Sequence, residues 1–233
     1  MNATSASPAD VHTGAPSAAA ATAAAGASRR VLDAPTRVVH WLMALCFVGA
    51  YVTADGERFR MVHVTLGYTL VGLVGWRVLW GLAGPRQSRL AVWLGKLRGA
   101  SSVVHAIKAG RMPLQAGQNV LQAAAVLGLL VAGVLVTATG YALFAEMAGG
   151  RWEDALEEVH EFLGNGMLAL VLAHLGLVLA GSVLRRQNQA LTMITGRVPG
   201  KGPDVARRNL LPVGALVLIA VISFWVWQWQ SVA

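Results

Sequence analysis

The amino-acid sequence predicts an all-α integral membrane protein with five transmembrane helices. Of its 233 residues, 55% are hydrophobic and only 13% are charged, which is typical of a membrane protein rather than a soluble one. Its apolar runs are also long, each close to the ~20 residues that a helix needs to cross a bilayer. They lie at about residues 38–54, 61–83, 119–143, 162–184 and 210–229.

The five runs divide the chain into three parts. Residues 1–33 begin with an Ala-rich stretch that has almost no large side chains, and we expect them to form a disordered cytoplasmic tail. Residues 34–200 contain the first four runs, which predict a four-helix transmembrane bundle. Residues 201–233 form a linker and a fifth, C-terminal transmembrane helix. No chain is left over for a second folded domain.

The net charge of +8 comes from the loops, and its distribution predicts the topology. If the N-terminus is cytoplasmic, the inner segments hold fifteen Lys and Arg residues and the outer loops hold three: Arg58, Arg60 and Arg151. The outer loops also carry eight acidic residues. This asymmetry follows the positive-inside rule, with the N-terminus inside and the C-terminus outside. It accounts for the basic excess without a nucleic-acid partner.

Cysteine usage limits the possible redox groups. Cys46 is the only cysteine, so the chain forms no internal disulfide and has no CxxCH motif for covalent haem attachment. Iron–sulfur sites with four cysteine ligands are excluded as well. Any redox centre must therefore be held by nitrogen, oxygen or methionine sulfur.

Histidines are the strongest candidate ligands. His12 lies in the tail and His105 in an inner loop, where we expect both to be solvent-exposed. A buried ionisable side chain in a membrane is costly and usually has a partner or a function. The remaining four histidines belong to predicted helices: His40, His63, His160 and His174.

The four helical histidines form two pairs at matched depths. His160 and His174 are fourteen residues apart, which places them roughly 40° apart around one helix and about 21 Å apart along it. The direction of the helices places His40 near the inner surface with His174, and His63 near the outer surface with His160. Each pair suits one haem b, whose iron takes an imidazole from either side. The four residues are therefore candidate metal ligands.

Three further residues are candidates for contact with such cofactors. Gly67 and Gly164 each lie four residues after a histidine, where a small residue lets a flat macrocycle approach the backbone. Glycines also pack transmembrane helices closely, which is the alternative interpretation. Arg77 lies fourteen residues after His63, and it either pairs with the carboxylates of an inner haem or extends to the inner surface.

Three segments resemble a known family: "RVVHWLMAL", "HVTLGYTLVGLVGWRVLWGLAGPRQSRL" and "EEVHEFLGNGMLALVLAHLGLVLAGSVLRRQNQALTMITGR". Together they are similar to the bacterial cytochrome b561 and nickel–iron-hydrogenase b-type cytochrome superfamily, over roughly residues 34–200. The resemblance implies a haem-binding four-helix core with two non-covalent haems b, whose ligands are the same four histidines. At the start of the third helix the chain departs from the family's pattern, because Gln118 stands where many members have histidine.

The resemblance also implies electron transfer between the quinone pool and a redox partner. That partner would be a hydrogenase-like subunit or a c-type cytochrome on the periplasmic side, and the chain would act as an electron carrier or as a subunit of a quinone-linked oxidoreductase. Two alternatives remain open. One is a haem-free transporter in which the histidines relay protons, and the other is a membrane anchor without redox function.

Overall fold

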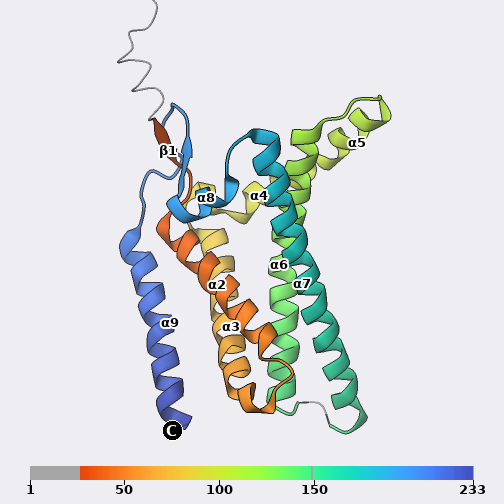
Figure 1. Ribbon diagram of the computed structural model, residues 1–233, viewed down its shortest axis with the longest axis vertical. Helices are drawn as coiled ribbons and strands as arrows, with labels where there is room; N and C mark the ends of the chain where they lie inside the picture. The colour runs from red at the N-terminus through yellow and green to blue at the C-terminus, as the bar shows by residue number, and fades with distance from the viewer. Residues whose placement is uncertain (1–26, 148, 233) are drawn as a thin grey trace, which may run out of the picture.

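The computed structural model describes residues 27–147 and 149–232, and it is an all-α membrane fold (Figure 1). Within these residues, five segments are long and apolar enough to cross a membrane. Their helices are α2 (Ala34–Val52), α3 (Arg60–Ala83, preceded by a 3₁₀ turn at Glu57–Phe59), α6 (Leu114–Phe144), α7 (Arg151–Arg185) and α9 (Leu211–Val232). The predicted fold class is therefore confirmed, with α6 and α7 longer than their apolar runs.

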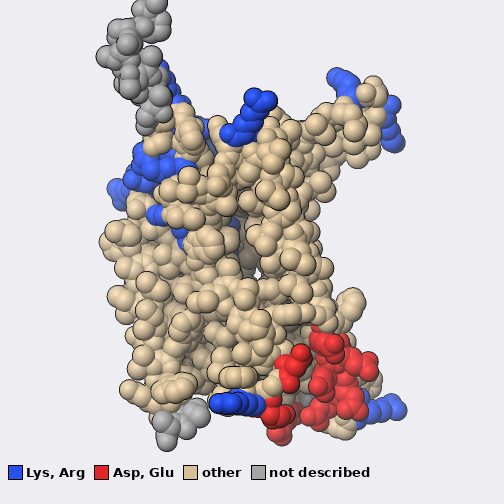
Figure 2. All heavy atoms as spheres, viewed as in Figure 1, with Lys and Arg blue, Asp and Glu red and all other residues tan. Residues whose placement is uncertain are grey.

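The two ends of the bundle differ in charge (Figure 2). At one end, where α2 begins and α7 ends, most of the Lys and Arg residues gather, and we call it the basic end. At the other, most of the Asp and Glu residues gather around the start of α7, and we call it the acidic end. Three short helices lie in the connections at the basic end: α4 (Leu90–Arg98), α5 (Ala100–Lys108) and α8 (Gln189–Thr195). The sequence analysis did not anticipate them.

The core is shared by all five long helices. Its buried members include Val39 and Phe47 of α2, Val74 of α3, Met167 of α7 and Val221 of α9, and Ala132 supplies the contact from α6. Many large apolar side chains face outward instead, as an apolar solvent such as lipid allows. The helices are therefore held together by a small set of buried apolar side chains, while many other large apolar side chains lie on the outer surface of the bundle.

The start of α2 is fixed by a buried carboxylate. Asp33 is fully buried and caps the helix, because one of its oxygens accepts a hydrogen bond from the Thr36 backbone N–H at 3.0 Å. Its other oxygen accepts from the Ser88 hydroxyl at 3.0 Å and from the Trp80 indole N–H at 3.4 Å. The acid thus joins the beginning of α2 to the end of α3, and it has donors enough to satisfy a buried charge.

A small two-stranded antiparallel sheet lies at the basic end. Strand β1 (Ser28–Arg30) pairs with β2 (Arg197–Pro199), with Arg29 opposite Val198. This finding corrects part of the predicted disordered tail. Residues 1–26 lie outside the described residues, but 28–33 are held in place. The composition of the tail could not indicate this pairing, because the partner strand is far away in the sequence.

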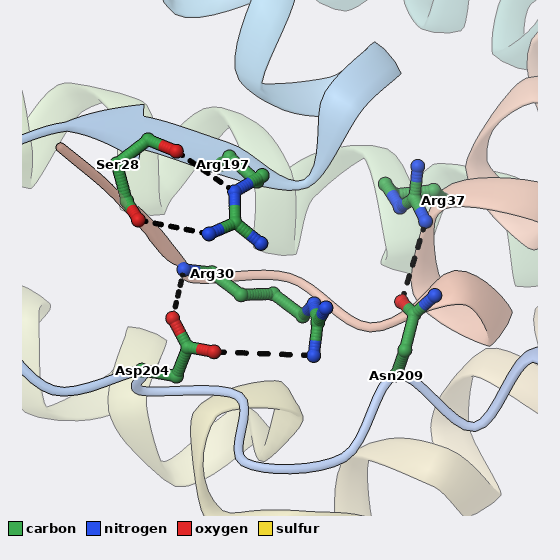
Figure 3. Close-up of polar contacts among 6 residues, drawn as sticks. All are labelled: Ser28, Arg30, Arg37, Arg197, Asp204 and Asn209. Carbon is green, nitrogen blue, oxygen red and sulfur yellow. Dashed lines mark hydrogen bonds and ion pairs between the residues drawn. The ribbon is translucent and has the colours of Figure 1, made fainter. Parts of the chain in front are cut away.

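Polar contacts hold the two strands and the linker to α9 together (Figure 3). The Arg30 backbone N–H donates to the Asp204 carboxylate at 2.6 Å, and the Arg30 guanidinium lies 3.9 Å from it. Arg197 donates to the Ser28 carbonyl oxygen at 2.8 Å and to its hydroxyl at 2.9 Å. We call β1, β2 and these contacts the clasp.

Helix α9 packs closely against the start of α2. A Cβ added at Gly214 would lie 3.3 Å from atoms of Ala34 and Pro35, so the two backbones nearly touch. Further along, the Trp225 indole N–H donates to the Thr69 hydroxyl of α3 at 2.9 Å. The fifth helix is therefore an integral part of the bundle (Figure 1).

Candidate functional site

The four helical histidines lie in two pairs, arranged as the sequence predicts. At the basic end, the ring centres of His40 and His174 are 6.4 Å apart, and the rings are inclined by 54°. At the acidic end, the ring centres of His63 and His160 are 6.2 Å apart, and the rings are nearly perpendicular at 83°. Each pair joins α7 to a different helix, α2 in the first case and α3 in the second.

The length of α7 allows it to contribute to both pairs. It begins at Arg151, nine residues before His160, and ends at Arg185, eleven residues after His174. The histidine positions of α2 and α3 follow from their opposite directions. His40 lies near the basic-end start of α2, and His63 lies near the acidic-end start of α3. The two sites are therefore separated by the ~21 Å that four turns of α7 span.

Hydrogen bonds assign the protons of the acidic-end pair. His63 Nδ1 lies 2.8 Å from the Ala50 carbonyl oxygen, which can only accept, so Nδ1 carries the proton. His160 Nδ1 lies 2.9 Å from the Thr139 hydroxyl, which itself donates to the Leu135 carbonyl oxygen at 3.0 Å. His160 therefore also donates from Nδ1. In both rings Nε2 then keeps its lone pair, which is the state that a metal ligand requires.

A cavity of about 260 Å³ adjoins the acidic-end pair, between α2, α3, α6 and α7. His63 and His160 line it, together with Gly67, Gly164 and mainly apolar side chains. A Cβ added at either glycine would meet no atom within 4 Å, so both glycines border open space rather than a packed helix. Both predicted glycines therefore lie where a flat group could approach the backbone.

Polar residues surround the basic-end pair. His174 Nδ1 lies 2.9 Å from the Gln122 side-chain nitrogen on α6. One turn earlier, buried Gln118 donates to the Leu177 carbonyl oxygen at 3.3 Å and accepts from Arg185. Gln118 thus ties α6 to the end of α7, and its hydrogen bonds among the described residues reach no histidine.

Comparison with known proteins decides the family. Residues 31–196 match the prokaryotic cytochrome b561 family, which is more than half of the chain. The chain belongs to this family. It is similar to a probable Ni/Fe-hydrogenase B-type cytochrome subunit of Azotobacter chroococcum mcd 1, with 29% identity over 71% of this chain and 86% of that protein. It is also 25% identical to a probable Ni/Fe-hydrogenase 1 B-type cytochrome subunit of Escherichia coli K12, over 72% of this chain and 90% of that protein. No solved structure matches.

Membership of the cytochrome b561 family implies b-type haem and a role in electron transport, and the two histidine pairs fit this group. A metal–imidazole bond is about 2.0 Å and the nitrogen lies about 1.15 Å from its ring centre, so two rings on one iron have centres about 6.3 Å apart. The observed 6.2 Å and 6.4 Å agree with this spacing. At the acidic end, the protonated Nδ1 atoms and the glycine-lined cavity support the same conclusion.

Arg77 of this cytochrome is buried, with 8% of its surface exposed. One guanidinium nitrogen donates to the Ser88 carbonyl oxygen at 3.2 Å, next to the buried Asp33 network. This contact belongs to a connection at the basic end, so both interpretations offered by the sequence stay predictions.

Gly140 and Thr139 of α6 are site residues that the sequence analysis missed. A Cβ added at Gly140 would lie only 2.8 Å from His160 Cε1, so the ring occupies the space of the absent side chain. Thr139 accepts the proton of the same imidazole. Both residues lie in an apolar run with no distinctive motif, and only the contact between α6 and α7 reveals their role.

Proposed function

We propose that this protein moves electrons across a membrane through two non-covalent haems b, each held by one histidine pair. The observation that carries the proposal is the pair of ring spacings, 6.4 Å and 6.2 Å, at opposite ends of one bundle. When bound, each haem supplies a one-electron ferric/ferrous couple. His40 and His174 would hold one group, and His63 and His160 the other.

The other predicted site residues have distinct roles in this proposal. Gly67 and Gly164 give a macrocycle room at the acidic end, since they border the cavity. Arg77 has donors besides the one bonded to Ser88, and it would pair with a carboxylate of the basic-end haem. Hydrogen bonds at Nδ1 hold the His63 and His160 imidazoles in one orientation.

The relatives support the choice of partner. Their names describe B-type cytochrome subunits of Ni/Fe-hydrogenases, so we propose a hydrogenase-like subunit as the partner at the acidic end. Asp55 and Glu161 line the cavity beside the histidine pair there. The quinone pool would exchange electrons near the basic-end pair. A c-type cytochrome is the second candidate partner, and cross-linking to a co-expressed hydrogenase would distinguish the two.

Haem analysis tests the central proposal. The purified protein is expected to give close to two haems b per chain in a pyridine haemochrome assay, because each histidine pair would hold one haem. Both should be extracted by acidic acetone, since no thioether bond retains them. A folded, monodisperse preparation without haem would overturn the proposal and favour a transporter or a structural anchor.

The topology is a second expectation, with the basic end facing the cytoplasm of the inner membrane. An alkaline phosphatase fusion after Ser231 should be active, because the C-terminus of α9 would lie in the periplasm. A matched fusion after Lys108 should be inactive, because α5 lies at the basic end. The reverse pattern would invert the proposed direction of electron transfer. Activity at neither site would mean that α9 does not span the membrane.

A further inference from the structure

The environment of His174 assigns a role to a glutamine on the neighbouring helix. We infer that Gln122 is a positioning residue, whose side-chain oxygen accepts the Nδ1 proton of His174 and so sets the redox potential of the basic-end haem. The inference rests on the proposed function, because it concerns a ligand of one of the two proposed haems. Gln122 itself was not selected by the sequence analysis.

The contact itself raises a chemical conflict. The Gln122 amide nitrogen lies 2.9 Å from His174 Nδ1, and an amide nitrogen can only donate. Nδ1 would then have to accept, which places the ring proton on Nε2. A protonated Nε2 has no lone pair for iron, so this arrangement is incompatible with ligation through Nε2.

A second observation resolves the conflict. The Gln122 side-chain oxygen is buried and has no hydrogen-bond partner among the described residues. The two ends of an amide have nearly the same shape, so turning the group by 180° exchanges oxygen and nitrogen without disturbing the packing. The oxygen then accepts from His174 Nδ1–H. This rotation gives the buried oxygen a donor and moves the amide NH2 group to the place that the oxygen held. It leaves His174 Nε2 with the lone pair that iron requires.

At the acidic end, both histidines also donate from Nδ1, but to acceptors of other kinds. His63 donates from Nδ1 to the Ala50 carbonyl oxygen, and His160 donates from Nδ1 to the Thr139 hydroxyl. Gln122 gives His174 an acceptor at the same ring position. Metal-ligating histidines almost always donate their second N–H in this way, which fixes the ring and makes it a stronger electron donor. A stronger donor stabilises the ferric state and lowers the potential.

Gln118 provides a matched control on the same helix. It lies one turn from Gln122 and is also a glutamine, but its amide bonds the Leu177 carbonyl oxygen and Arg185. Replacing Gln118 therefore removes a polar link between α6 and α7 without touching a histidine. If Gln122 acts through His174, replacing Gln122 should change the redox potential of the basic-end haem, and replacing Gln118 should not.

The test is a spectroscopic redox titration of the full chain with its haems, using Gln122→Leu, Gln122→Glu and Gln118→Leu. Gln122→Leu should raise the potential of one haem, the one that His174→Ala removes. Loss of such a partner costs about 10- to 100-fold in affinity. A tenfold loss confined to the ferric form corresponds to a rise of about 59 mV. Gln122→Glu keeps an acceptor oxygen and should not raise the potential, and Gln118→Leu should leave both potentials unchanged.

Three outcomes would overturn the inference. They are an unchanged potential in Gln122→Leu, an equal rise in Gln118→Leu, and an equal rise in Gln122→Glu, which would reduce Gln122 to a packing residue. If Gln122→Leu does not accumulate, Gln122→Met keeps the side-chain length and serves for the same measurement. A wild-type protein without two haems would instead overturn the proposed function, so the two failures are distinguishable.

Discussion

His63→Ala and His160→Ala are expected to remove one haem, and His40→Ala and His174→Ala the other. Each variant should retain about one haem per chain, because the ring pairs lie at opposite ends of the bundle and share no ligand. The remaining site should keep its six-coordinate, low-spin spectrum. Visible spectra of the reduced and oxidised variants, combined with redox titrations, would show one of the two components missing.

His105→Ala is the matched control for these four substitutions. His105 is exposed on α5, and its Nδ1 contacts the Ser101 carbonyl oxygen of its own helix at 2.7 Å. Its removal should leave both haems in place. If the variants instead group as His40 with His160 and His63 with His174, the ring pairs of the structure are not the pairs that bind haem.

Gly140→Ala is expected to impair the acidic-end haem and spare the basic-end one. The new Cβ would lie 2.8 Å from His160 Cε1, which is closer than real Cβ contacts, and the neighbour is a ring fixed by Thr139. Either the imidazole turns away from its ligating position or α6 moves away from α7. Such overpacking typically costs about 1–3 kcal/mol of stability. We expect haem affinity at this site to fall about 10- to 100-fold, as when the orientation of a ligand is lost.

Gly128→Ala separates this effect from the general cost of adding a methyl group to α6. Its Cβ would lie 3.7 Å from the Leu170 side chain, which is an ordinary van der Waals contact. Haem content and thermal unfolding should therefore change little in Gly128→Ala. Equal haem loss in both variants would show that α6 tolerates no added volume and that Gly140 has no particular relation to His160.

The long helices and the histidine pairs could be predicted because both depend on local rules. The length of an apolar run sets the number of spans, and the helix repeat sets the angle and distance between His160 and His174. The alternation of helix directions then assigns His40 and His63 to opposite ends. None of these steps requires knowledge of how one helix is rotated against another.

The remaining site residues depend on that rotation. Thr139, Gly140 and Gln122 act through contacts between α6 and α7, and their neighbours in sequence give no indication of the histidines they meet. The same is true of Arg77, whose neighbours in sequence do not indicate its contact with Ser88. Periodicity shows which face of a helix is apolar, but it does not show which residue stands opposite.

The clasp has a consequence for the order in which the protein is made. Arg30 and Asp204 are separated by 174 residues, so at about 5–20 residues per second the ribosome needs roughly 9–35 s to supply the partner. Over that interval β1 has no strand to pair with, while α2, α3, α6 and α7 are synthesised in turn. The clasp therefore closes only on a chain that already contains all four helical histidines. The contact between Arg30 and Asp204 thus belongs to the last stage of synthesis, after α2, α3, α6 and α7 have been made.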